Sequence, residues 1–137
     1  MYKALVIDDD PIFQYIAEKI FNKTNLFEET NCFLDGNLAL EFLEKNGDDA
    51  ASLPDAIFLD IYMPALSGWE FLNSFDKISS SLKKNIPIYL LTSSIDPKEI
   101  QRSREHPAVR AFSSKPVTQE FIEHAYKDCD QVHRQSA

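Results

Sequence analysis

The sequence predicts an α/β fold, with an open, doubly wound parallel sheet covered by helices on both faces. Apolar runs of strand length alternate with amphipathic segments of helix length, which is typical of βαβ units. One run, residues 56–59 (AIFL), is apolar at every position, as expected of a central parallel strand. The 137 residues suit one domain that buries roughly two-thirds of its unfolded surface.

Five strands are expected, and each is a run that stops at polar residues. They occupy residues 4–7, 29–34, 56–59, 86–91 and 109–113. The second run is the weakest and the fifth is short. Ligands of open α/β sheets bind outside the carboxyl ends of the strands, so the polar residues at these ends are the candidate site.

The first three helices follow from their start signals. Asp10 before Pro11 predicts a helix start, because aspartate caps a helix N-terminus and proline suits its first turn. A turn at residues 35–36 (DG) precedes a second helix around residues 37–45. A third helix is expected after residues 67–68 (SG), since several large apolar side chains follow there at spacings suited to packing.

The last two helices are also marked by capping residues. Asp96 before Pro97 repeats the first start signal, and Glu99 stands where a capping box would place it. Thr118 can cap a final helix, after which only residues 131–137 are expected to remain. We therefore expect a domain over residues 1–132, a short C-terminal tail at residues 133–137, and no output domain.

Composition excludes several classes of protein. The formal net charge of −8 argues against direct nucleic-acid binding, which depends on Lys and Arg neutralising phosphates. Cys32 and Cys129 form no CxxC motif and the histidines show no ligand spacing, so structural zinc is not expected. Without a signal-peptide segment or an apolar run of membrane-spanning length, the expected location is cytoplasmic.

Acidic residues stand at two of the expected strand ends. Asp8 and Asp9 follow the first strand, and Asp60 follows the third. Two carboxylates about 4 Å apart repel by roughly 4 kcal/mol at an effective dielectric near 20, so a cluster of three favours a bound divalent cation. Oxygen ligands favour Mg²⁺, with Asp9 and Asp60 as direct ligands and Asp8 acting through water. Asp10 is better explained as the helix cap.

Four motifs at strand ends, taken in order, resemble those of the receiver domain of two-component response regulators. They are residues 6–10 (VIDDD), 59–64 (LDIYMP) with 67–68 (SG) following, 91–93 (LTS) and 112–116 (FSSKP). The resemblance covers the chain from Tyr2 to about Val132. It implies a flavodoxin-like sheet with the strand order 2-1-3-4-5 and five helices.

The resemblance and the residue chemistry assign roles to this cluster. Asp60 is the expected nucleophile and phosphoacceptor, because a carboxylate at the end of a buried central strand can attack phosphorus. The Lys115 ammonium and the Thr92 hydroxyl are expected to bind phosphoryl oxygens. By resemblance, the backbone carbonyl of Tyr62 is a further magnesium ligand.

Thr92 and Phe112 are the expected switch residues. Added phosphoryl charge would draw the Thr92 hydroxyl inward, and Phe112 could fill the vacated space, as an aromatic residue does in receivers. The alternative is that Phe112 is an ordinary core residue. The Tyr62 side chain, two residues after the acceptor, is expected to overhang the phosphoryl group and alter its lifetime.

The favoured function is that of a stand-alone receiver that takes a phosphoryl group from a partner phosphohistidine and signals through protein contacts. The donor would be a sensor histidine kinase or a histidine phosphotransfer protein, and the receiver a monomer or a weak phosphorylation-dependent dimer. We expect no enzyme activity on external substrates, only self-modification of the acceptor and its autodephosphorylation. One alternative is an aspartate-nucleophile phosphatase resembling haloacid dehalogenases, but Asp60 lacks their Asp-x-Asp context. Another is a receiver-like module that is never phosphorylated.

Overall fold

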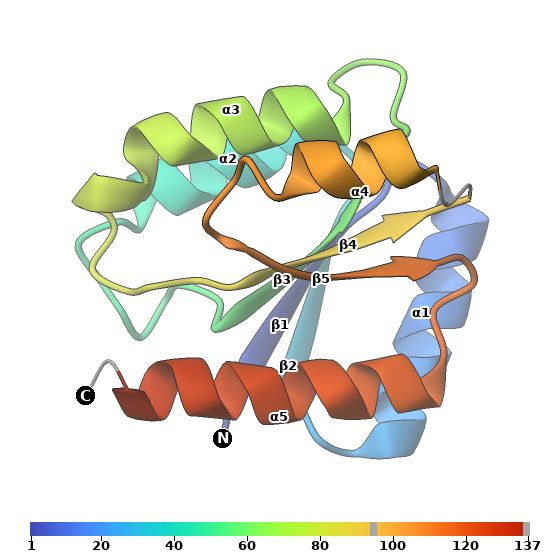
Figure 1. Cartoon of the computed structure of the whole chain (residues 1–137). Helices are drawn as coiled ribbons and strands as arrows, with labels where there is room; N and C mark the ends of the chain where they lie inside the picture. The colour runs from blue at the N-terminus through green and yellow to red at the C-terminus, as the bar shows by residue number, and fades with distance from the viewer. Residues whose placement is uncertain (94–95, 136–137) are drawn as a thin grey trace.

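The computed structural model describes residues 1–93 and 96–135 and confirms the predicted fold class. A five-stranded parallel sheet has the order β2-β1-β3-β4-β5, which is the flavodoxin-like order (Figure 1). The strands are β1 Lys3–Ile7, β2 Glu29–Phe33, β3 Ala56–Asp60, β4 Ile88–Thr92 and β5 Val109–Ser114. Ser94, expected in the polar turn after the fourth strand, and the last two residues of the expected tail lie outside the described residues.

Helices cover both faces of the sheet. They are α1 Pro11–Thr24, α2 Gly36–Lys45, α3 Gly68–Ile78, α4 Pro97–Ser103 and α5 Gln119–Gln135, with a short 3₁₀ turn at Ser79–Ser81. Figure 1 shows α1 and α5 on one side and α2, α3 and α4 on the other. Each side has its own apolar cluster, so β3, at the centre of the sheet, is buried along its whole length. Among the described residues, no helix combines the length and apolar character needed to span a membrane.

The expected caps are confirmed at three helix starts, whereas one expected capping box does not form. Thr118 caps α5 by accepting a hydrogen bond from the Phe121 amide at 3.1 Å. Asp10 caps α1 by accepting a hydrogen bond from the Ile12 amide at 2.9 Å, and Asp96 caps α4 in the same way. The capping box expected with Glu99 is wrong, because the Glu99 carboxylate accepts a hydrogen bond from the Tyr62 hydroxyl instead. A complete capping box occurs at the start of α3, formed by Ser67 and Glu70.

Two element boundaries differ from the expected ones by more than one residue. The fourth strand begins at Ile88 rather than residue 86, because Pro87 has no N–H group to donate to the ladder. The last helix was expected to leave residues 131–137 outside it, but α5 continues to Gln135. Its final turn is held by His133, which stacks on Tyr2 and hydrogen bonds to the Asp55 carbonyl at 2.8 Å.

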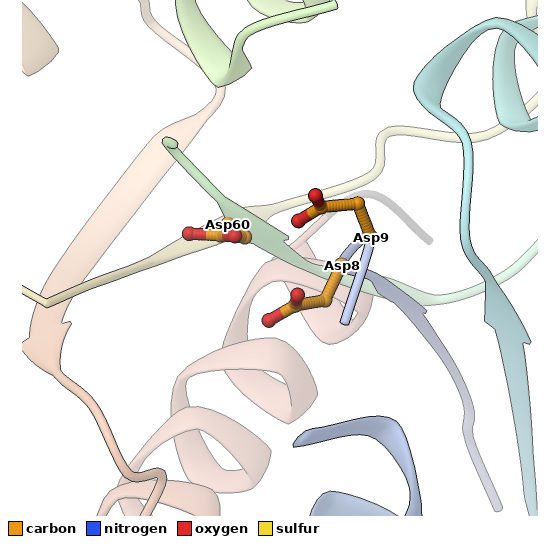
Figure 2. Close-up of side chains that lie close together, drawn as sticks. All are labelled: Asp8, Asp9 and Asp60. Atoms are coloured by element: carbon orange, nitrogen blue, oxygen red, sulfur yellow. The ribbon is translucent and has the colours of Figure 1, made fainter. Parts of the chain in front are cut away.

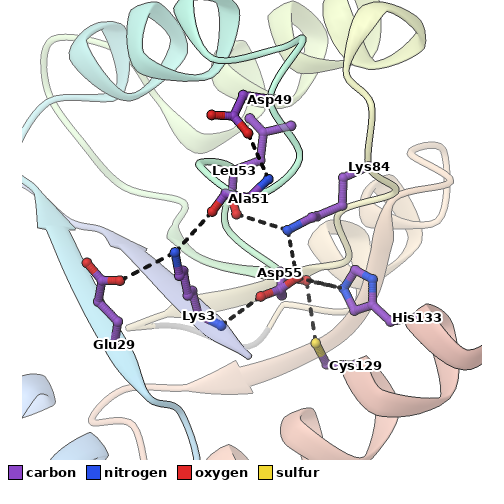
Figure 3. A network of polar contacts seen from close by, with 9 residues as sticks. All are labelled: Lys3, Glu29, Asp49, Ala51, Leu53, Asp55, Lys84, Cys129 and His133. Carbon is purple, nitrogen blue, oxygen red and sulfur yellow. Dashed lines mark hydrogen bonds and ion pairs between the residues drawn. The ribbon is translucent and has the colours of Figure 1, made fainter. Parts of the chain in front are cut away.

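Asp55 joins several elements at the amino ends of the strands. Its carboxylate accepts hydrogen bonds from the Lys3 amide at 2.8 Å and from the Lys84 ammonium at 2.9 Å. Its carbonyl oxygen receives contacts from Cys129 and His133 of α5 (Figure 3). This network attaches α5 to the end of the sheet opposite the candidate site.

Candidate functional site

Strand register brings the polar stretches together at the carboxyl ends of β1, β3, β4 and β5. Ile7 pairs with Leu59, so the residues that follow them, Asp8 and Asp60, lie on adjacent strands. Across the next ladder Asp60 pairs with Leu91, the residue before Thr92. Lys115 comes last, and its backbone amide donates to the Thr92 carbonyl at 2.7 Å. Residues far apart in sequence therefore meet at one edge of the sheet.

Asp8, Asp9 and Asp60 form a cluster of carboxylates. Each offers an oxygen within 4.8 Å of those of the other two, and Figure 2 shows the three groups turned toward a common space. Opposite ligands of octahedral Mg²⁺ are about 4.2 Å apart, since each Mg–O bond is about 2.1 Å long. Three hard oxygen donors at this spacing fit Mg²⁺ after small side-chain movements.

The Lys115 ammonium lies between two of these carboxylates. Its Nζ atom is 2.6 Å from Asp8 Oδ2 and 3.2 Å from Asp60 Oδ2. The remaining oxygens are held by backbone amides: Asp10 N–H donates to Asp8 Oδ1, and Tyr62 N–H donates to Asp60 Oδ1 at 3.2 Å. One lysine and two amides thus orient the carboxylates, and a single positive charge faces three carboxyl groups.

This charge imbalance changes the acidity of Asp60. Burial, and then the negative charge of Asp8, raise the pKa of Asp60 to about 7, although Lys115 opposes the shift. Burial alone would lower the pKa of Lys115, but its hydrogen bond to Asp8 and the charges of Asp60 and Asp8 outweigh burial and raise it. Lys115 therefore stays charged near neutral pH, while Asp60 is poised between its two protonation states.

The chain after β3 is held close to Asp60 by a glycine. The Gly68 amide donates to the Ile61 carbonyl at 2.7 Å, and a Cβ added to Gly68 would lie 2.6 Å from Ile61 Cα and 2.8 Å from the Asp60 carbonyl oxygen. Only glycine permits this approach of α3 to the end of β3. The connecting loop therefore starts and ends beside Asp60.

Tyr62 is the first exposed residue of this loop. Its hydroxyl donates to Glu99 in the first turn of α4, so it links the segment after Asp60 to that helix. The expectation that its side chain overhangs a phosphoryl group stays a prediction.

Thr92 and Phe112, the expected switch residues, lie on the neighbouring strands β4 and β5. Thr92 is fully buried at the end of β4. Phe112 is half-buried on β5, opposite Leu90, and packs against the apolar cluster beneath α2 and α3. Its partial exposure is compatible with either a switch or a core role.

Two residues of α1 contribute to the site in ways that sequence reasoning missed. Gln14 is buried, and its side-chain amide donates to the carbonyls of Val6, Asp8 and Phe33, which joins α1 to the ends of β1 and β2. Phe13 lies against the lysine of the site, because the Lys115 Nζ is 4.2 Å from the centre of its ring. Gln14 could have been found in the sequence, because it is a polar residue on the otherwise apolar face of α1. No local feature of the sequence separates Phe13 from the other apolar residues of this helix.

Comparisons with known proteins agree with this arrangement. A family model described as the response regulator receiver domain matches residues 4–127. A two-component response regulator from Cytophaga hutchinsonii has a similar structure, with a TM-score of 0.86, 29% identity, and coverage of 94% of this chain and 96% of that one.

Longer proteins contain a similar region. The chain is 32% identical over 123 residues to the sensor histidine kinase CheAY of Helicobacter pylori, covering 88% of this chain and 14% of that protein. It is also 32% identical over 115 residues to the sensory/regulatory protein RpfC of Xanthomonas campestris, covering 84% and 15% respectively. The chain thus spans a small part of these relatives.

Proposed function

The chain belongs to the response regulator receiver family, and on that premise we propose that it accepts a phosphoryl group from a partner phosphohistidine onto Asp60. Receivers are signalling domains rather than enzymes acting on external substrates. The observation that carries the proposal is the position of the Asp60 carboxylate. It is buried at the end of the central strand, beside two further carboxylates and 3.2 Å from a lysine ammonium.

The proposed transfer exchanges one bond for another. An Asp60 carboxylate oxygen attacks phosphorus, a P–O bond forms, the P–N bond to the imidazole breaks, and the leaving nitrogen keeps the electron pair and takes a proton. Asp60 must be ionised to attack, and its pKa of about 7 leaves a substantial ionised fraction at neutral pH. Lys115 would move from Asp60 Oδ2 to a phosphoryl oxygen, and the Thr92 hydroxyl would donate to another.

Mg²⁺ would be held here by Asp9 and Asp60 as direct ligands, by Asp8 through water and by the backbone carbonyl of Tyr62. When bound, it would offset the carboxylate charge and the charge of the phosphoryl oxygens. The chain's own residues prepare the site for it, since the amides of Asp10 and Tyr62 hold one oxygen of Asp8 and one of Asp60.

The proposed output is a change at the face formed by α4, β5 and α5. A phosphoryl oxygen that draws the Thr92 hydroxyl inward would free space for Phe112, which is already half-buried next to the core. The link between Tyr62 and Glu99 supports a response of α4 to the same event.

The proposed donor is a histidine kinase or a histidine phosphotransfer protein. Ile12, Tyr15 and Ile16 on α1 are 71%, 63% and 43% exposed, and Ile12 stands only two residues after the cap of the helix that follows Asp9. A partner that brings its phosphohistidine to Asp60 would pack on these side chains. Replacing Ile12 with aspartate should then slow transfer from the partner, but leave labelling by acetyl phosphate unchanged.

The stand-alone role and the cytoplasmic location remain proposals based on the family. The mass of the native polypeptide tests the first, because a stand-alone receiver of this sequence has a mass of 15.7 kDa and a longer protein would contradict it. Fractionation of cells that produce the native protein tests the second.

The decisive experiment compares wild type with Asp60→Asn. Both are incubated with Mg²⁺ and acetyl phosphate, and the intact mass is measured; beryllofluoride binding is measured separately by NMR. A gain of one phosphoryl group in wild type alone supports the proposal. Equal labelling of both proteins, or no labelling and no beryllofluoride binding by wild type, contradicts it.

A further inference from the structure

We propose that Phe13 is a positioning residue for Lys115, holding the ammonium over the acceptor site through a cation–π contact. The Lys115 Nζ atom lies 4.2 Å from the centre of the Phe13 ring, within the range of about 6 Å typical of such contacts. The inference rests on the proposed function, because it concerns how Lys115 meets a phosphoryl oxygen.

The ring is fixed before any ligand arrives. Phe13 is 8% exposed and belongs to the apolar cluster beneath α1 and α5. The Asp10 cap sets the start of its helix, and the Gln14 amide joins the next residue to the ends of β1 and β2. Contact with such a ring restricts the flexible Lys115 side chain in advance. Less conformational entropy is then lost when its ammonium binds a phosphoryl oxygen.

The ring also has the right chemistry for this position. A lysine ammonium has three donors and no acceptor, and two of its directions face Asp8 and Asp60. A carboxylate or carbonyl in the place of the Phe13 ring would compete with the phosphoryl oxygen for the Lys115 ammonium. The face of a phenyl ring attracts the cation without accepting a conventional hydrogen bond, so Lys115 stays free to change partners.

The contact predicts that phosphoryl binding depends on the electrostatics of the ring and not only on its size. Phe13 is replaced by phenylalanine carrying one, two or three fluorine atoms, which progressively weaken the negative face while almost preserving shape. The dissociation constant of beryllofluoride, at saturating Mg²⁺, should rise stepwise to a total of about 2- to 30-fold. The same replacements at Phe27, an equally buried phenylalanine in the same cluster, should have no graded effect.

A second measurement shows that the effect passes through Lys115. In a Lys115→Met background the fluorine series should no longer change the residual affinity, because the cation is gone. In metal-free wild type, NMR should also show the Lys115 ε-methylene protons shifted upfield by the ring, and Phe13→Leu should abolish that shift.

The outcomes separate this inference from the proposed function. Suppose that wild type binds beryllofluoride but the dissociation constant does not change across the fluorinated variants of Phe13, or changes as it does for Phe27. The role of Phe13 is then refuted while the receiver function stands. If the series persists in the Lys115→Met background, the ring acts through another group and the inference also fails. Absence of both beryllofluoride binding and acetyl phosphate labelling in wild type refutes the proposed function itself, and this inference with it.

Discussion

Replacing Asp60 with asparagine should stabilise the metal-free protein at neutral and alkaline pH. Burial and the charge of Asp8 raise the pKa of Asp60 from 3.8 to about 7, so the ionised carboxylate is unfavourable in the folded state. A shift of about three pKa units corresponds to about 4 kcal/mol. Solvent and salt at the open edge of the sheet screen part of this, so we expect a gain of about 2 kcal/mol.

The sign and the pH window follow from proton linkage. Between pH 3.8 and about 7 the folded protein keeps a proton on Asp60 that the unfolded chain has lost, so raising the pH through this window destabilises the fold. The asparagine variant has no ionisable side chain at this position. The difference in free energy of unfolding between variant and wild type should therefore be near zero at pH 4, grow up to about pH 7 and remain constant above it.

The assay is urea unfolding in EDTA at several pH values, followed by the fluorescence of Trp69, the only tryptophan of the chain. Asp48→Asn, at an exposed position outside the cluster, is the matched control and should show no comparable trend. Adding Mg²⁺ should stabilise wild type more than the variant, because on the proposed function the ion would bind the folded state through Asp60. A pH-independent difference, or a variant less stable than wild type at pH 8 in EDTA, would refute this account of the charge cluster.

Three further changes test other parts of the structure. Gly68→Ala should destabilise the fold by about 1–3 kcal/mol and weaken beryllofluoride binding, because the added Cβ would overlap the backbone at Ile61 and Asp60; unfolding and titration experiments measure both effects. Tyr62→Ala should shorten the half-life of phosphorylated Asp60 several-fold, because the ring would no longer overhang the phosphoryl group and keep water from it, whereas Tyr62→Phe, which keeps the ring, should not. Equal half-lives of wild type and Tyr62→Ala would contradict this role of the ring. Asp55→Ala should cost about 3–5 kcal/mol of stability, since it leaves the Lys84 ammonium without its carboxylate. Because Asp55 lies at the opposite end of the sheet, beryllofluoride affinity of the folded variant should be unchanged, and a loss of affinity would contradict that separation.

Local pattern was sufficient for most elements of the fold. Apolar runs predicted five strands, and aspartate before proline predicted the starts of α1 and α4, because these signals act over a few neighbouring residues. Apart from the start of β4, which Pro87 sets locally, the main errors came where distant residues decide the outcome. Glu99 turns to Tyr62 instead of completing a capping box, and α5 extends to Gln135 with His133 bonded to Asp55.

The order of residues along the chain is enough to place polar side chains at the ends of the strands, and with them the candidate acceptor, metal ligands and lysine. How these groups affect one another depends on tertiary packing. Register across β1, β3, β4 and β5 sets Lys115 between Asp8 and Asp60, and burial then moves the pKa of Asp60 toward neutrality. The contact of Phe13 with Lys115 likewise depends on how α1 packs against the sheet. Distances and dielectric surroundings arise from contacts between remote segments, and a local sequence pattern carries no measure of either.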